Sequence, residues 1–155
     1  MIGTILAVVG TLLGAVVSGL FQHKSAGRTE QTARREQHRR EQLDAITTLA
    51  QAISDHRRAM WMRGDAKLKH HSAERQQELR GESHLTRSAV TRPLVAMRLL
   101  VTDPAVRTAA DHMVTLTYAM RNADTSTDHL TEARAAALDA HDAFVNAAAA
   151  YLQTV

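Results

Sequence analysis

The residues of this chain that could most readily bind a metal are its nine histidines, because the 155-residue sequence contains no cysteine. A di-metal centre inside a helical bundle takes glutamates from two helices and Glu-x-x-His pairs from two others. No Glu-x-x-His occurs in this sequence. Histidine stands next to a carboxylate, or two residues from one, in pairs such as Asp55–His56, Glu82–His84, Asp111–His112 and His141–Asp142. Residues this close in sequence point in different directions on a helix, so we expect neither a metal site nor a bound cofactor.

Motifs for catalysis are also missing from the sequence. It contains no Gly-x-Ser-x-Gly nucleophile elbow, and its glycines stand alone and form no phosphate-binding loop. We therefore expect the protein not to be an enzyme.

Two short polar stretches remain as candidates for a partner-binding surface. The first contains His56, Arg57, Arg58 and Trp61, the single tryptophan of the chain. The second contains Glu82, His84 and Arg87. One interpretation is ordinary hydrogen bonding between helices, because paired charges on helices are usually structural and solvated. The other is a surface for a partner, because tryptophan and arginine are enriched at the energetic centres of protein interfaces.

The elements that must position these residues begin with an uncharged N-terminal segment. Residues 2–21, IGTILAVVGTLLGAVVSGLF, carry no charged side chain, and about 20 helical residues span the ~30 Å hydrocarbon core of a bilayer. A cleaved signal peptide would have basic residues before the apolar run, whereas here they follow it. We therefore predict a transmembrane anchor over residues 1–22. Small residues on one face of that helix predict packing against a second copy: Gly3, Ala7, Gly10, Gly14 and Ser18.

A basic juxtamembrane stretch, residues 23–42, follows the anchor and is predicted to continue it as a solvated helix. Its basic residues are Lys24, Arg28, Arg34, Arg35, Arg39 and Arg40. By the positive-inside rule this flank stays in the cytoplasm. The prediction is a single-pass protein of the cell membrane, with its N-terminus outside and residues 43–155 forming a cytoplasmic domain.

The same positive charges have two other possible uses. They could contact anionic lipid headgroups or the phosphates of a nucleic acid. Direct nucleic-acid binding is disfavoured, because glutamates are interleaved with the arginines. Glu30, for example, precedes Arg34 by four residues, a spacing that supports an exposed helix.

Apolar residues at helical spacing predict four helices in the remaining chain. The first begins after Gln42 and is expected to end near Arg63–Gly64. The second covers residues 73–101, and Pro93 is expected to kink or break it.

A third helix is predicted to begin at Asp103 and Pro104, which fit the cap and the first helical position. Residues 122–128 read as a loop, and the last helix covers residues 130–152. Abundant alanine and an aromatic content of only 3% favour closely packed helices over a sheet. The predicted fold is all-α: one N-terminal transmembrane helix continues into an antiparallel bundle or a long helical hairpin, closed within one chain or between two copies.

Several blocks of the sequence resemble the KilB-type plasmid spread proteins of filamentous actinobacteria. They are the uncharged start, the arginine-rich neck, DHRRAMW at residues 55–61, ESHLTRSAVTRPL at residues 82–94 and TYAMR at residues 117–121. The likeness runs in order along most of the chain and brings no catalytic residue with it. It implies a membrane-associated accessory factor for the spread of conjugative plasmid DNA between mycelial compartments, working beside a DNA translocase.

From the sequence we therefore expect a non-enzymatic, membrane-anchored helical protein that self-associates and recruits a partner of the DNA-transfer machinery. One alternative is a membrane-tethered nucleic-acid-binding protein that uses Arg34, Arg35, Arg39, Arg40, Arg57 and Arg58. Another is a small oligomeric membrane protein of the pore or lysis type, which the large folded domain disfavours.

Overall fold

The computed structural model describes the backbone of residues 2–154 and the side chains of residues 30–154. All regular structure in the described backbone is helical: α1 (Ile2–Leu68), α2 (Ala73–Leu100), α3 (Pro104–Ala119), the short 3-10 helix η1 (Met120–Asn122) and α4 (Thr127–Leu152). The all-α prediction is confirmed. The chain divides into two compact units, residues 1–39 and residues 40–155.

In the first unit, side chains are described only from Glu30 onward. Residues 30–39 are exposed, and Arg34 Nη2 pairs with Glu30 Oε1 at 2.6 Å. The predicted membrane-spanning segment lies outside the residues whose side chains are described, as do Gly3, Ala7, Gly10, Gly14, Ser18, Lys24 and Arg28. Among the residues that are described, no helix is both long enough and apolar enough to cross a membrane.

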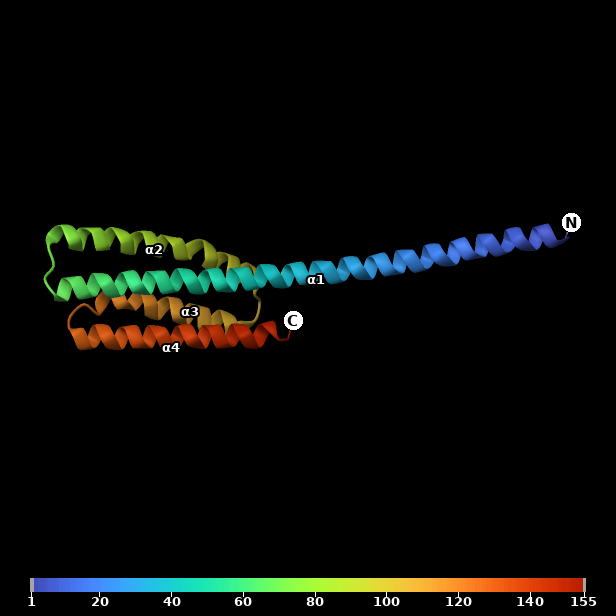
Figure 1. Ribbon diagram of the computed structural model, residues 1–155. Helices are drawn as coiled ribbons and strands as arrows, with labels where there is room; N and C mark the ends of the chain where they lie inside the picture. The colour runs from blue at the N-terminus through green and yellow to red at the C-terminus, as the bar shows by residue number, and fades with distance from the viewer. Residues whose placement is uncertain (1, 155) are drawn as a thin grey trace. The chain divides into compact units, whose positions relative to one another are not determined.

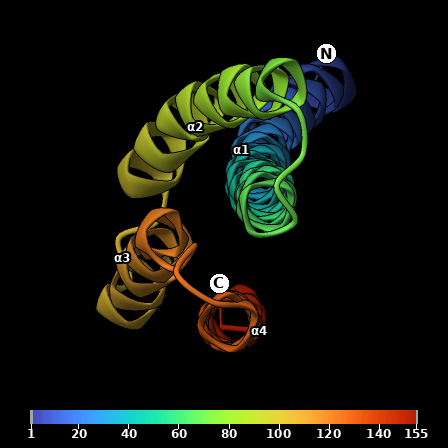
Figure 2. The same ribbon diagram turned by 90° about the vertical axis from the view of Figure 1, so that its left-hand side faces the viewer.

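The second unit is an antiparallel four-helix bundle built from the last part of α1 and from α2, α3 and α4 (Figure 1). Seen end-on in Figure 2, α2 and α4 lie on either side of α1 and α3 completes the square. All four helices contribute to the main core, which includes Leu49, Ile53, Val90, Met97, Val106, Met113, Phe144 and Ala148. A smaller core surrounds Met60, Met120 and Leu130. The bundle therefore closes within one chain.

Pro93 was expected to kink or break the second helix, and the structure shows no break. α2 runs through it without interruption to Leu100, and Figure 2 shows that the helix is curved. Val90 and Met97, on either side of the proline, are fully buried in the core. Their packing stabilises a helix that lacks one backbone hydrogen-bond donor.

The helix expected to end near Arg63–Gly64 continues to Leu68. Gly64 lies inside it because α4 passes very close: a Cβ at this position would be 2.8 Å from Leu130 Cδ2. Two residues beyond the helix, His70 has a φ of 53°, which places it in the left-handed region. His71 N donates to Ala66 O at 2.9 Å and His70 N to Lys67 O at 3.1 Å. This pair of bonds forms a Schellman motif, which satisfies carbonyls at the helix end.

Short polar side chains cap the other helices at their N-termini. Ser72, Asp103 and Ser126 each accept a hydrogen bond from a backbone amide in the first turn of α2, α3 and α4, respectively. The predicted start of the third helix at Asp103 and Pro104 is confirmed.

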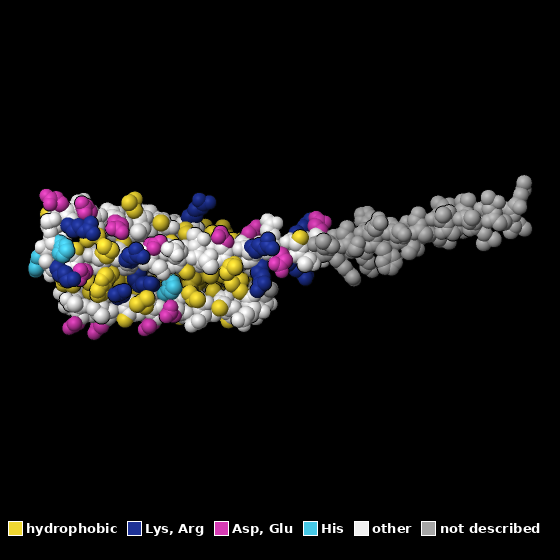
Figure 3. All heavy atoms as spheres, viewed as in Figure 1, with side chains coloured by type: hydrophobic (Ala, Val, Ile, Leu, Met, Phe, Trp, Pro, Cys, Tyr) yellow, Lys and Arg dark blue, Asp and Glu magenta, His cyan; other side chains and the backbone are white. Residues whose placement is uncertain are grey.

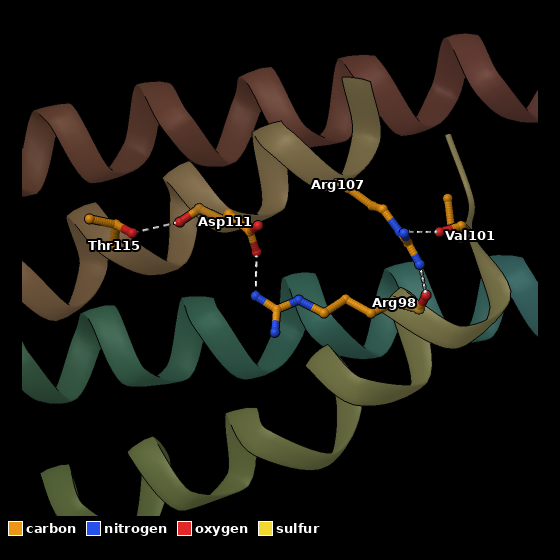
Figure 4. A network of polar contacts seen from close by, with 5 residues as sticks. All are labelled: Arg98, Val101, Arg107, Asp111 and Thr115. Carbon is orange, nitrogen blue, oxygen red and sulfur yellow. Dashed lines mark hydrogen bonds and ion pairs between the residues drawn. The ribbon is translucent and has the colours of Figure 1, made fainter. Parts of the chain in front are cut away.

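Arginine side chains hold the connection between α2 and α3 (Figure 4). Arg107 donates to the backbone carbonyls of Arg98 and Val101, the latter at 2.9 Å. Arg98 Nη2 pairs with Asp111 Oδ1 at 2.6 Å. Arg107 thereby satisfies carbonyls at the C-terminal end of α2, where the last carbonyls have no partner within the helix.

Gln42 ties three helices together at the start of the bundle. Its side chain is 4% exposed, and Nε2 donates to Leu100 O at 2.9 Å and to Tyr151 Oη at 2.8 Å. The predicted juxtamembrane stretch therefore ends on a residue that packs inside the bundle.

Candidate functional site

The first polar stretch of the sequence is divided between two sides of α1. Successive residues on a helix are about 100° apart around its axis, so His56 and Arg57 point toward different neighbours. His56 faces α2 and α3, where its Nδ1 lies 3.0 Å from Thr86 Oγ1. Arg57 lies on the side of α4, in a cavity that Arg134 also lines.

His56 belongs to a cavity of about 350 Å³ between α1, α2 and α3, which we call the arginine cavity. Each helix contributes residues three or four positions apart, the spacing of one helix face. The lining residues are His56, Met60 and Arg63 from α1, Arg80, Ser83, His84 and Arg87 from α2, and Tyr118 and Arg121 from α3 and η1.

The lining of the arginine cavity is strongly positive. Four of its residues are arginines, and none of the lining residues is an aspartate or a glutamate. Other arginines of the described region, Arg34, Arg75 and Arg98, have carboxylate partners. Within residues 30–154 no such ion pair involves Arg63, Arg80, Arg87 or Arg121. These four arginines therefore line the cavity without a carboxylate at ion-pair distance among the described side chains.

His56 is buried at the edge of this cavity, with 2% of its surface exposed. Burial, and secondarily the positive charge of Arg87, lower the pKa of His56 from 6.5 to about 4. The imidazole is therefore neutral at pH 7. Thr86 Oγ1 also lies within hydrogen-bond distance of the carbonyls of Glu82 and Ser83. Because its single proton is directed to those carbonyls, we assign the imidazole proton to Nδ1, which donates to Thr86.

Tyr118 connects His56 with Arg87. The edge-to-face contact between the rings of His56 and Tyr118 has a centroid distance of 5.3 Å. Arg87 Cζ lies 4.2 Å from the centroid of the Tyr118 ring, a cation–π contact that holds the guanidinium in place.

A second cavity, of about 260 Å³, lies between α1 and α4. Arg57, Arg58, Trp61 and Arg134 are among its lining residues, and Arg134 Cζ lies 4.7 Å from the Trp61 ring centroid. Figure 3 shows basic side chains gathered between these two helices. Arg57 Nη1 is buried without a hydrogen-bond partner among the described residues. Burial and then the charge of Arg134 lower the pKa of Arg57, against the opposing effect of Asp142.

Candidate residues three or four positions apart on a helix therefore lie in the same cavity, whereas some that are adjacent in sequence lie in different ones. His56, His84 and Arg87 come together, while Arg57, Arg58 and Trp61 lie in the other cavity. Glu82 is exposed and lines neither of them. Arg34, Arg35, Arg39 and Arg40 are exposed and lie outside both cavities.

Sequence reasoning missed several residues of the arginine cavity, above all Arg63, Arg80, Tyr118 and Arg121. A signal was present: Arg80, His84 and Arg87 recur at positions i, i+4 and i+7, as do His56, Met60 and Arg63. Within residues 30–154, no group of three or more histidines and carboxylates could hold a metal ion.

The residues that line both cavities fall within the part of the chain that matches a known protein family. The family model described as KilB plasmid transfer protein matches residues 43–152. The chain belongs to this family. Its sequence is 42% identical over 149 residues to Protein KilB from Streptomyces lividans, in an alignment that covers 96% of this chain and 97% of that protein. The resemblance to KilB-type proteins is therefore confirmed. No solved structure is significantly similar to this member of the KilB family.

Proposed function

We propose that this chain is a non-enzymatic, single-pass membrane protein that acts as an accessory factor in the spread of conjugative plasmid DNA. The observation that carries the proposal is its 42% identity to Protein KilB over 149 of 155 residues. Because only six residues of the chain fall outside this alignment, it includes most of the uncharged segment and the basic stretch. Membership of the KilB plasmid transfer protein family supports a role in plasmid spread.

The membrane part of the proposal rests on the order of charges in the sequence. Residues 2–21 are uncharged and are followed by basic residues. A stretch of that length suits a bilayer span, and the basic flank favours the cytoplasm. In this proposal residues 40–155 act as an interaction module on the cytoplasmic side and recruit a protein partner of the transfer machinery.

The geometry of the bundle supports a role without catalysis. The nearest approach to a nucleophile with a base is Ser54, whose Oγ lies 3.3 Å from His141 Nε2. Asp142 Oδ1 lies 3.5 Å from His141 Nδ1, and the Asp142 side chain is 75% exposed. Both distances exceed the range typical of a catalytic triad. Ser54 also lies inside α1, where backbone amides bond within the helix and cannot form an oxyanion hole.

Topology is the first property to test. A reporter active only in the cytoplasm would be fused after Val155, beside a matched reporter active only outside the cell. We expect the cytoplasmic reporter to work and the external one to fail. The reverse result would refute the proposed orientation and remove the module from cytoplasmic partners.

The need for the anchor can be tested in mycelium that carries a plasmid lacking its own KilB-family protein. The full chain should restore plasmid spread, and a chain without residues 2–21 should not. A third chain would carry an unrelated uncharged span in place of residues 2–21. If it restores plasmid spread, the segment acts only as a tether; if it does not, the segment has a specific role. Full spread without any anchor would contradict the proposal.

Self-association of the anchor is part of the same proposal. Because the chain has no cysteine, one introduced cysteine gives an unambiguous disulfide crosslink. Ala7→Cys lies on the small-residue face and should crosslink in membranes. Ile5→Cys, two residues away and about 200° around the helix, is the matched control and should not. Equal crosslinking at both positions, or none at either, would refute association through this face.

A further inference from the structure

We propose that the arginine cavity binds a small soluble ligand that carries two linked phosphoryl groups. Arginines from three separate parts of the fold line this cavity: Arg63 from α1, Arg80 and Arg87 from α2, and Arg121 from η1. Its volume of about 350 Å³ falls within the range of small-molecule sites. This inference is independent of the proposed membrane topology.

The charge of the cavity selects a ligand with several negative charges. Like charges gathered around one cavity repel one another, and no aspartate or glutamate lines this cavity to offset them. His56 adds no charge at neutral pH, since its imidazole is neutral. A single carboxylate would offset one of the four guanidiniums, whereas a diphosphate offers several charges and many acceptor oxygens. Arginine matches phosphoryl oxygens with paired, charge-assisted hydrogen bonds.

One of the binding groups is already held in position. The guanidinium of Arg87 is stacked over Tyr118, with Cζ 4.2 Å from the ring centroid. Tyr118 in turn contacts buried His56, which bonds to Thr86 one residue before Arg87. This arrangement reduces the entropy lost when Arg87 is ordered by a ligand.

A nucleic acid fits this arrangement less well than a small ligand. Non-specific binding of a nucleic acid needs basic residues that follow a phosphate backbone over many nucleotides, and for single strands also needs exposed aromatic rings. Here the arginines converge on one cavity, and Arg87 covers a face of the Tyr118 ring.

The test is a titration of the full chain, in a non-ionic detergent, with sodium diphosphate in a calorimeter. Sodium chloride would be adjusted to keep the ionic strength constant. We expect saturable binding at one site. Arg80→Gln combined with Arg121→Gln should weaken it about 10-fold or more, because two charge-assisted contacts are lost. Arg92→Gln is the matched control, since Arg92 is also exposed on α2 but lines a different cavity.

Absence of binding by the unchanged protein would overturn the proposal. An equal loss in the Arg92→Gln control would also do so, because it would show diffuse attraction to surface charge. Binding of duplex DNA that depends on Arg80 and Arg121, without binding of diphosphate, would replace the proposal with a nucleic-acid site. Competition by phosphatidic acid in the detergent micelle would also overturn the proposal of a soluble diphosphate, because it would assign the site to a lipid headgroup with a single phosphate.

Thermal unfolding gives a second measurement that does not depend on calorimetry. Arg80 and Arg121 are exposed and have no carboxylate partner among residues 30–154, so their replacement leaves the core intact. Without ligand, the double variant should unfold at a higher temperature than the unchanged protein, because repulsion is relieved. Diphosphate should raise the unfolding temperature of the unchanged protein and of Arg92→Gln, but not that of the double variant. A double variant that is stabilised equally by diphosphate would refute the site.

Discussion

Lowering the pH from 7 to 4.5 should destabilise the helical bundle through the side chain of His56. Its pKa is about 4 in the folded protein and 6.5 in the absence of the fold. Above pH 6.5 the imidazole is neutral in both states, and its full contribution to stability is present. Between pH 6.5 and 4 the unfolded chain binds a proton that the folded chain does not, so stability falls as the pH falls. Below pH 4 both states are protonated and the loss stops.

The size of this effect follows from the shift in pKa. Each pKa unit corresponds to about 1.4 kcal/mol, so a shift from 6.5 to about 4 gives an upper limit of about 3.5 kcal/mol. His56 adjoins an open, polar cavity, where solvent weakens electrostatic interactions. We therefore expect a loss of about 2 kcal/mol by pH 4.5.

The assay is urea unfolding at several pH values between 7 and 4.5, followed by the fluorescence of Trp61 and by circular dichroism. His56→Asn is the reference variant, because its amide nitrogen keeps a donor near Thr86 and does not titrate. The variant should be less stable at pH 7, and the gap should narrow by about 2 kcal/mol toward pH 4.5. The other ionisable side chains are common to both proteins and cancel in this difference. A gap that stays constant over this pH range would refute the reasoning.

Four other substitutions test the packing and hydrogen bonding of the bundle by chemical denaturation. Gly81→Ala should raise the free energy of unfolding by about 1 kcal/mol, because the added Cβ meets no atom within 4 Å apart from its chain neighbours and its own helix backbone. Gly64→Ala should instead lower it by about 1 kcal/mol, since crowding against Leu130 outweighs the gain in helix propensity; equal effects at the two glycines would contradict the close approach of α1 and α4. Thr117→Val should raise the free energy of unfolding by about 1 kcal/mol, because the buried Thr117 hydroxyl has no hydrogen-bond partner among the described residues. A clear decrease would show that this hydroxyl does form a hydrogen bond in the folded protein. Gln42→Leu should lower the free energy of unfolding by about 2 kcal/mol, because the Leu100 carbonyl and the Tyr151 hydroxyl lose the amide that donates to them. An unchanged midpoint of unfolding would show that water replaces the amide as donor.

Local signals were sufficient to predict the class of fold and several helix boundaries. Periodic apolar residues, abundant alanine and scarce aromatics predicted an all-α protein, which the structure confirms. Asp103 and Pro104 marked the start of α3, because capping depends on residues within one turn. The ordered blocks of sequence also indicated the KilB family. The transmembrane anchor stays a prediction that rests on the composition of residues 2–21.

The tertiary structure decided the features that depend on neighbours distant in sequence. Pro93 lies within an unbroken α2 because buried residues on both sides pack into the core. Gly64 marks a close contact with α4 and not a helix end. The arginine cavity needs Arg63, Arg80 and Arg121 from three parts of the chain. Sequence spacing shows which residues share a face of one helix, but only the packing of helices against one another determines which faces meet.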